Sequence, residues 1–69
     1  MIVQVTKTPG PVQSFSIESG ATVRQTLDLA GITSFDGYRI EVDGATRDLN
    51  DEVFNGDTVI LVKQIKGNS

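Results

Sequence analysis

Residues 55–65, NGDTVILVKQI, contain the most apolar run of the chain, and this run decides how the rest is arranged. The first three residues, Asn-Gly-Asp, favour a turn, so a new element begins directly after them. From Val59 through Val62 every residue is apolar, whereas a strand with one solvated face would alternate between apolar and polar residues. The run is therefore predicted to be a central strand that is paired on both sides.

The opening of the chain predicts an antiparallel hairpin. In residues 2–7, IVQVTK, Val3 and Val5 alternate with polar residues, as in a strand with one face in the core. Residues 8–11, TPGP, then force a turn, because proline has no amide hydrogen to give to a strand ladder. A second alternating stretch, VQSFSIES at residues 12–19, supplies the other strand of the hairpin.

The next segment, SGATVRQTLDLAGI at residues 19–32, changes to a helical period. Thr22 and Gln25 have the spacing of a capping box, in which each side chain bonds the backbone amide of the other residue. Gly31 is placed to end the helix in a left-handed conformation, with Ile32 packing after it. The helix has only about two turns, so it must pack on the sheet to be stable. The residues expected on its buried face are Val23, Leu27 and Ala30.

Two further stretches complete the pattern. Residues 37–44, GYRIEVDG, predict a strand with Tyr38, Ile40 and Val42 on one side, followed by a turn at Asp-Gly. Residues 45–57 have no sustained period. They predict a very short strand around Thr46 and Arg47, then a tight helical turn. The residues expected to point inward from that turn are Leu49, Val53 and Phe54.

This order of elements predicts an α+β fold. The last strand is expected to lie parallel to the first in a mixed sheet of four to five strands, with one short helix crossing one face. No repeat or linker interrupts the chain. One domain is therefore expected over residues 1–66, followed by a flexible tail at residues 67–69.

The composition excludes several classes of function. The chain has 69 residues, a net charge of −3, no Cys and no His. It therefore lacks disulfides, thiolate metal sites and the most common general base, so neither an enzyme nor a bound metal or cofactor is expected. The acidic residues 43–52 do not have the spacing of a calcium-binding loop. Net negative charge argues against nucleic acid as a partner. Without a signal peptide or membrane span, a cytoplasmic protein is expected.

The chain resembles the β-grasp, or ubiquitin-like, family, and within it most resembles the small bacterial sulfur carriers of the molybdopterin and thiamin pathways. The resemblance rests on the opening hairpin, on GATVRQTLDLAGI (residues 20–32), on YRIEVDG (residues 38–44) and on FNGDTVILVKQIKG (residues 54–67). It implies the β-grasp sheet with one helix. In the carriers, an activating enzyme adenylates the last glycine of a Gly-Gly tail, which is then converted to a thiocarboxylate.

The tail of this chain departs from that pattern. Matched to the carriers, Gly67 takes the position of the penultimate glycine, Asn68 takes that of the terminal glycine, and Ser69 is an addition. Lys66 and Gly67 would form a carrier tail only after Asn68 and Ser69 are removed. The resemblance then implies an adenylating, E1-like enzyme as the partner.

The alternation of the last strand also predicts a partner-binding surface. If Val59 and Leu61 face the core, Ile60 and Val62 lie on the open face of the sheet. Ile2 lies on the same open face if Val3 and Val5 of the first strand face the core. With Lys63, the residue that follows Val62, these residues are the candidate partner contacts. The alternative is that Ile60 and Val62 are β-branched for strand propensity and are covered by long neighbouring side chains.

Two functions remain open from the sequence. The first is a small non-catalytic interaction module that binds another protein through its open sheet face, the exposed edge of its second strand or its acidic side. The alternative is a sulfur carrier or ubiquitin-like modifier activated at Gly67 after removal of the two residues that follow it. A third and weaker option is a module that binds a small soluble ligand, although no residue identifies one.

Overall fold

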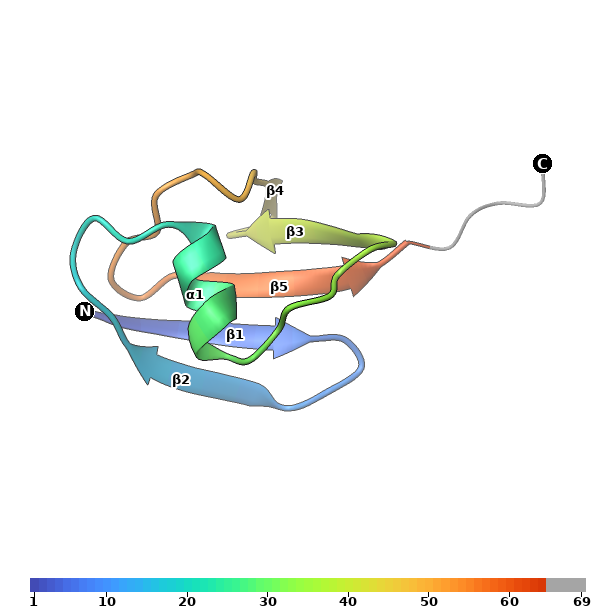
Figure 1. The fold of residues 1–69 in the computed structure, drawn as a ribbon, viewed down its shortest axis with the longest axis horizontal. Helices are drawn as coiled ribbons and strands as arrows, with labels where there is room; N and C mark the ends of the chain where they lie inside the picture. Colours follow the sequence, from blue (N-terminus) through green and yellow to red (C-terminus); the bar gives the residue numbers. More distant parts are fainter. Residues whose placement is uncertain (65–69) are drawn as a thin grey trace.

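In the computed structural model, which describes residues 1–64, five strands form one mixed sheet and a single helix lies across one face of that sheet (Figure 1). This arrangement confirms the predicted α+β class, with the predicted order of elements. The elements are β1 (Ile2–Lys7), β2 (Val12–Ser16), α1 (Val23–Leu29), β3 (Tyr38–Val42), β4 (Ala45–Thr46) and β5 (Thr58–Lys63).

The apolar run near the end of the chain is the central strand, as predicted. The strands lie in the order β2-β1-β5-β3-β4, so β5 has a neighbour on each side. It pairs parallel to β1, with Val59 opposite Val5, and antiparallel to β3, with Leu61 opposite Ile40. The side chains of a strand enclosed in this way are flanked by those of both neighbours, which fits the apolar run at residues 59–62.

The core lies between the sheet and α1. The inward positions at the middle of β1, β3 and β5 carry aliphatic residues, and Val23 and Leu27 of the helix pack onto them. The helix is too short to be stable in isolation, so burial of this face is what keeps it folded. The buried apolar residues are Val3, Val5, Ala21, Val23, Leu27, Ile40, Val42, Val53, Val59 and Leu61.

The helix begins and ends where the sequence predicts. The Thr22 amide donates to Gln25 Oε1 (2.9 Å), and the Gln25 amide donates to Thr22 Oγ1 (3.4 Å), which completes the capping box. At the other end Gly31 has a φ of 74°, and the Ile32 amide donates to the Leu27 carbonyl (2.9 Å). These bonds satisfy backbone groups that have no partner within the helix.

The strand β4 lies one residue earlier than predicted, at Ala45–Thr46 rather than around Thr46 and Arg47. Asp43 and Gly44 both have positive φ values, 54° and 78°, which is the geometry of a two-residue hairpin turn. Such a turn pairs the two residues that flank it, so the new strand starts immediately after Gly44.

A tight turn follows β4 as predicted, and Leu49 and Val53 point inward, but the inward position predicted for Phe54 was wrong. Residues 48–51 form a single hydrogen-bonded turn, and the chain then runs beside the start of α1, where Glu52 pairs with Thr22. Along extended backbone, successive side chains point in opposite directions. Val53 is therefore fully buried, whereas Phe54 is 60% exposed.

Candidate functional site

The open face of the sheet, on the side away from α1, carries the candidate contacts predicted on β5. Val59 and Leu61 are fully buried beneath the helix, and Ile60 and Val62, on the opposite face, are half-buried. The alternation predicted for this strand is therefore confirmed. The registers of the four strand pairs place one row of side chains across the whole open face: Val12, Thr6, Ile60, Glu41 and Thr46.

Long polar side chains border the two aliphatic residues of β5. Glu41 lies opposite Ile60, and Arg39 lies opposite Val62, both on β3. The two are joined by an ion pair, with Arg39 Nε at 2.7 Å from Glu41 Oε2. This ion pair covers one side of the apolar surface, which accounts for the partial burial of Ile60 and Val62. The exposed apolar surface is thus narrower than the alternation alone suggests.

Two of the predicted contacts lie away from Ile60. Ile2 is 51% exposed, but the row of side chains that contains Gln4 and Thr58 separates it from the row that contains Ile60. Within that separating row, the Thr58 hydroxyl donates to Gln4 Oε1 (3.3 Å). The offset of four residues corresponds to about 13 Å along the strands. Lys63 alternates to the helix side of the sheet, opposite Tyr38. The structure therefore groups Ile60 with Val62 and separates both from Ile2 and Lys63.

One residue of this face was missed from the sequence. Val12 is 57% exposed and lies in the same row as Ile60, with Thr6 between them. The sequence does indicate its position: if Phe15 and Ile17 face the core, the alternation of side chains places Val12 on the opposite, open face. We define Val12, Ile60 and Val62 as the open-face patch.

Lys66 and Gly67, predicted as the carrier tail after processing, and the flexible tail expected at residues 67–69 lie outside the described residues. The last described residue is Gln64, whose amide donates to the Gly37 carbonyl (2.8 Å). This point follows the last residue of β5, at the end of the sheet that also carries the turn between β1 and β2 (Figure 1).

The acidic stretch between β3 and β5 uses two of its carboxylates to form turns. Asp51 Oδ2 accepts from the Asp48 amide (2.9 Å), and Asp57 Oδ2 accepts from the Phe54 amide (2.8 Å). Among the described residues, no three side chains of the types that bind metals converge on one point. The hydrogen bonds of Asp51 and Asp57 give these two carboxylates a local structural role.

No helix within residues 1–64 has the length and hydrophobicity that crossing a lipid bilayer would demand.

Comparison with known proteins finds matches in structure but none in the sequence comparisons. No protein-family model and no curated protein matches the chain in sequence. Its structure is similar to SAMP1 from Haloferax volcanii, with a TM-score of 0.81, 16% identity, and 99% of this chain and 100% of that one covered. A second crystal structure, of H. volcanii small archaeal modifier protein 1, gives a TM-score of 0.78, 15% identity, and coverage of 93% and 98%.

A third similar structure is a ubiquitin-like protein from the hyperthermophilic archaeon Caldiarchaeum subterraneum. It gives a TM-score of 0.61 and 18% identity, and the match covers 97% of this chain and 100% of that one. At identities this low, structural similarity shows the fold alone. It confirms the fold that the sequence predicted.

Proposed function

From the β-grasp, ubiquitin-like fold of this chain, we propose that it is a small protein modifier or carrier that acts through the carboxyl group of Gly67. The chain would first have to be cut after that residue. The observation that carries the proposal is the structural similarity to small archaeal modifier protein 1, which extends over nearly the whole of both chains. The modifier role thus gains more support than the interaction module favoured by the sequence.

The end of β5 supports this proposal geometrically. Modifier chemistry needs a folded body that holds a short tail at a defined point, so that an enzyme can bind the body while the carboxyl group enters the active site. The strand that leads to the tail is paired on both sides, and the backbone bond from Gln64 to Gly37 holds it up to the last described residue. Gly67 follows only three residues later in the sequence.

The chemistry would be supplied by a partner, an adenylating, E1-like enzyme. Attack of the Gly67 carboxylate on the α-phosphorus of ATP forms an acyl-adenylate and releases pyrophosphate. A lysine amine of a target then displaces AMP to give an isopeptide bond, whereas hydrosulfide displaces AMP to give a thiocarboxylate. This chain contributes the carboxyl group and the surface by which it is recognised.

We assign that recognition to the open-face patch of Val12, Ile60 and Val62. Ile60 and Val62 lie on the strand that continues into the tail, so an enzyme that holds Gly67 comes close to them. Aliphatic side chains that are only half-buried gain further burial on binding. This assignment retains the open sheet face that the sequence predicted as a docking surface, and names the adenylating enzyme as the protein that binds there.

The test is made in the native cell with the full chain, tagged at its N-terminus, beside a Gly67→Val variant. We expect the parent chain to yield a species that ends at Gly67, together with covalent conjugates or a thiocarboxylate, all identified by mass spectrometry. The Gly67→Val variant should yield none of these products. If every molecule of the parent chain retains Asn68 and Ser69 and no conjugate forms, the modifier proposal fails and a purely non-covalent interaction module remains.

A further inference from the structure

The two edges of the sheet, as the described residues form it, differ in how they are protected. The edge strand β4 has two residues and is flanked by charges at Asp43, Arg47 and Asp48. The opposite edge strand, β2, has five residues, VQSFS, with no charge and no proline among them. Edge strands in monomeric proteins are usually short, charged or interrupted by proline, because such features prevent further pairing. The β2 edge is longer than the β4 edge and has no such feature within the strand, although Pro11 directly precedes it.

The hydrogen bonds of the hairpin show which backbone groups of β2 face outward. The Met1 ammonium donates to the Ile17 carbonyl (2.9 Å), and the Ile17 amide donates to the Met1 carbonyl (2.8 Å), so these residues form a hydrogen-bonded pair. In an antiparallel ladder, bonded and non-bonded pairs alternate. The backbone groups that point away from β1 are therefore those of Val12, Ser14 and Ser16.

The bonds of β1 to its other neighbour confirm this alternation. The Gln4 amide donates to the Asp57 carbonyl (2.9 Å), and the Ile2 carbonyl accepts from the Gly56 amide (2.8 Å). Gln4, the residue opposite Ser14, thus directs its amide away from β2. The amide and the carbonyl of Ser14 are left at the outer edge of the sheet, in position to pair with an added strand.

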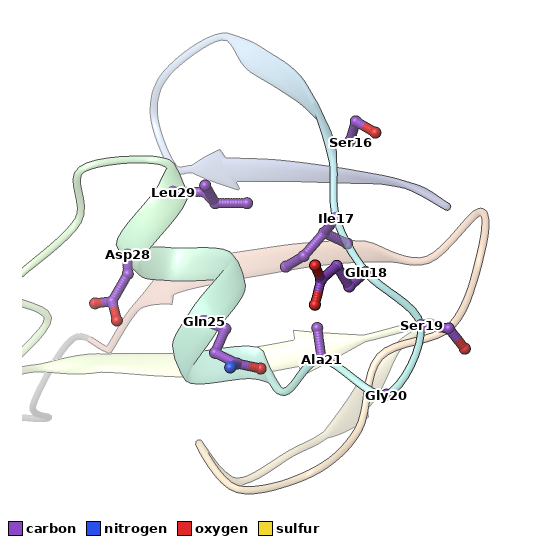
Figure 2. Close-up of a pocket in the computed structure, with 9 residues that line it drawn as sticks. All are labelled: Ser16, Ile17, Glu18, Ser19, Gly20, Ala21, Gln25, Asp28 and Leu29. Atoms are coloured by element: carbon purple, nitrogen blue, oxygen red, sulfur yellow. The ribbon is translucent and has the colours of Figure 1, made fainter.

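A groove lies beside this edge, between α1 and the segment that follows β2 (Figure 2). Its volume is about 510 Å³. Ile17 and Leu29 point toward one another from its two sides, with Ala21 between the helix and the segment, and Leu29 is 49% exposed. An aliphatic side chain placed between Ile17 and Leu29 would bury apolar surface that now faces water.

The groove is negatively charged. Glu18 and Asp28 are the only charged residues among those that line it, and neither forms an ion pair within the described part of the chain. A Lys or Arg side chain brought beside either of these exposed carboxylates would gain electrostatic energy. The groove therefore favours a cationic ligand with an apolar component.

We propose that the β2 edge and this groove bind an extended, basic segment of another protein, which adds a sixth strand to the sheet. Its backbone pairs with the outward groups of Ser14, and its alternate side chains, about 7 Å apart, enter the groove. An aliphatic side chain lies between Ile17 and Leu29, and a Lys or Arg side chain lies beside Glu18 or Asp28. This binding is non-covalent and does not depend on cleavage after Gly67.

A second copy of the chain fits the edge less well. The strand it would offer, β2, has no basic residue to place beside Glu18 and Asp28. Each copy also has a net charge of −3, so the two bodies repel one another. Charge complementarity thus selects a basic segment over a second copy.

The test of strand addition uses Ser14→Pro and, as its matched control, Ser14→Val. Proline removes the outward amide hydrogen of residue 14 but no bond to β1, whereas valine keeps that hydrogen and favours a strand. The probe is a synthetic eight-residue peptide, capped at both ends, with the sequence Val-Ser-Lys-Ser-Val-Ser-Lys-Ser, so that valine and lysine alternate along one face of the added strand. We expect Ser14→Val to bind it within about twofold of the full parent chain, and Ser14→Pro to bind at least about tenfold more weakly.

The charge of the ligand is tested by a double variant, Glu18→Lys with Asp28→Lys. It should lose affinity for the lysine peptide and prefer a peptide with glutamate in place of lysine. The control, Asp36→Lys with Glu52→Lys, changes the net charge equally at exposed positions outside the groove, and it should still prefer the lysine peptide.

Several results would overturn the proposal. These are unchanged binding by Ser14→Pro, peptide-induced amide shifts at residues 43–57 instead of 12–17, and no binding by the parent chain at millimolar peptide. A parent chain that self-associates and protects the Ser14 amide from exchange would make a second copy the occupant. The amide spectrum checks that Ser14→Pro is folded, and Ser16→Pro, which also removes an outward amide hydrogen, replaces it if it is not.

Discussion

The two faces of β5 show how one strand takes part in both folding and recognition. Its four central residues are all aliphatic, yet Val59 and Leu61 are fully buried under α1, whereas Ile60 and Val62 are half-buried on the open face. Residue type alone does not separate these pairs. Position relative to the helix does, because α1 covers one face of the sheet only (Figure 1). The covered face should therefore govern stability, and the open face binding.

The strongest test of this contrast is Leu61→Ala. The substitution leaves a cavity in the covered face and should lower the free energy of unfolding by about 3 kcal/mol. A domain of this length has a stability of roughly 3–10 kcal/mol, so this loss is a large fraction of the total. Urea unfolding followed by circular dichroism measures it. A loss below about 1 kcal/mol would mean that the packing under α1 is not what holds the sheet together.

Thr22→Ala tests how far the covered face depends on the start of its helix. Loss of the hydroxyl leaves the Gln25 amide without its capping partner, and the free energy of unfolding should fall by about 1 kcal/mol. The same urea titration measures the change, with Thr33→Ala, an exposed position outside the helix, as the control. Equal unfolding midpoints for the two variants would show that the cap adds nothing measurable.

Ile60→Ala provides the matched substitution on the open face of the same strand. Because Ile60 is half-buried and bordered by Glu41, the free energy of unfolding should fall by less than that for Leu61→Ala, by about 1 kcal/mol. Capture of the activating enzyme from native extract by the tagged chain should nevertheless be lost. Unchanged capture would remove Ile60 from the recognition surface, and unfolding as severe as that of Leu61→Ala would make it a core residue.

The smallest effect is expected for Arg39→Ala, which removes the ion pair on the open face. Exposed ion pairs contribute about 0.2–1 kcal/mol, so the unfolding midpoint should barely change. Loss of the Arg39 side chain uncovers Val62, however, and binding through the open-face patch should be maintained or strengthened. Measurement of both quantities in low and high salt separates the contribution of the charge from that of the covering side chain.

Local features of the fold were predicted well from the sequence. The capping box at Thr22, the helix end at Gly31 and the Asp-Gly turn before β4 all lie where the sequence places them. Each depends on hydrogen bonds or backbone angles within a few residues. The apolar run of β5 also identified the central strand, because side chains of a strand with a neighbour on each side are flanked by other side chains even on the open face, where Ile60 and Val62 are half-buried.

The candidate site was predicted only in part. Alternation placed Ile60 and Val62 on the open face, but it also grouped them with Ile2 and Lys63, which lie elsewhere. Alternation gives the face of a residue within its own strand. It does not give the residue opposite in the next strand, so the sequence did not show that Val12 shares a row with Thr6 and Ile60. Phe54 was misplaced because a helical period was assumed for an extended segment.

What the sequence by itself determined is the set of elements, their ends and the two faces of each strand, since capping, turn chemistry and alternation act over a few neighbouring residues. Only the tertiary structure decided the register between strands, and with it which exposed side chains adjoin one another and which backbone groups of β2 remain free. Register depends on pairing between residues such as Thr6 and Ile60 that are far apart in the chain. A slip of one residue would exchange the two faces of a strand, so the packing of the whole core selects it.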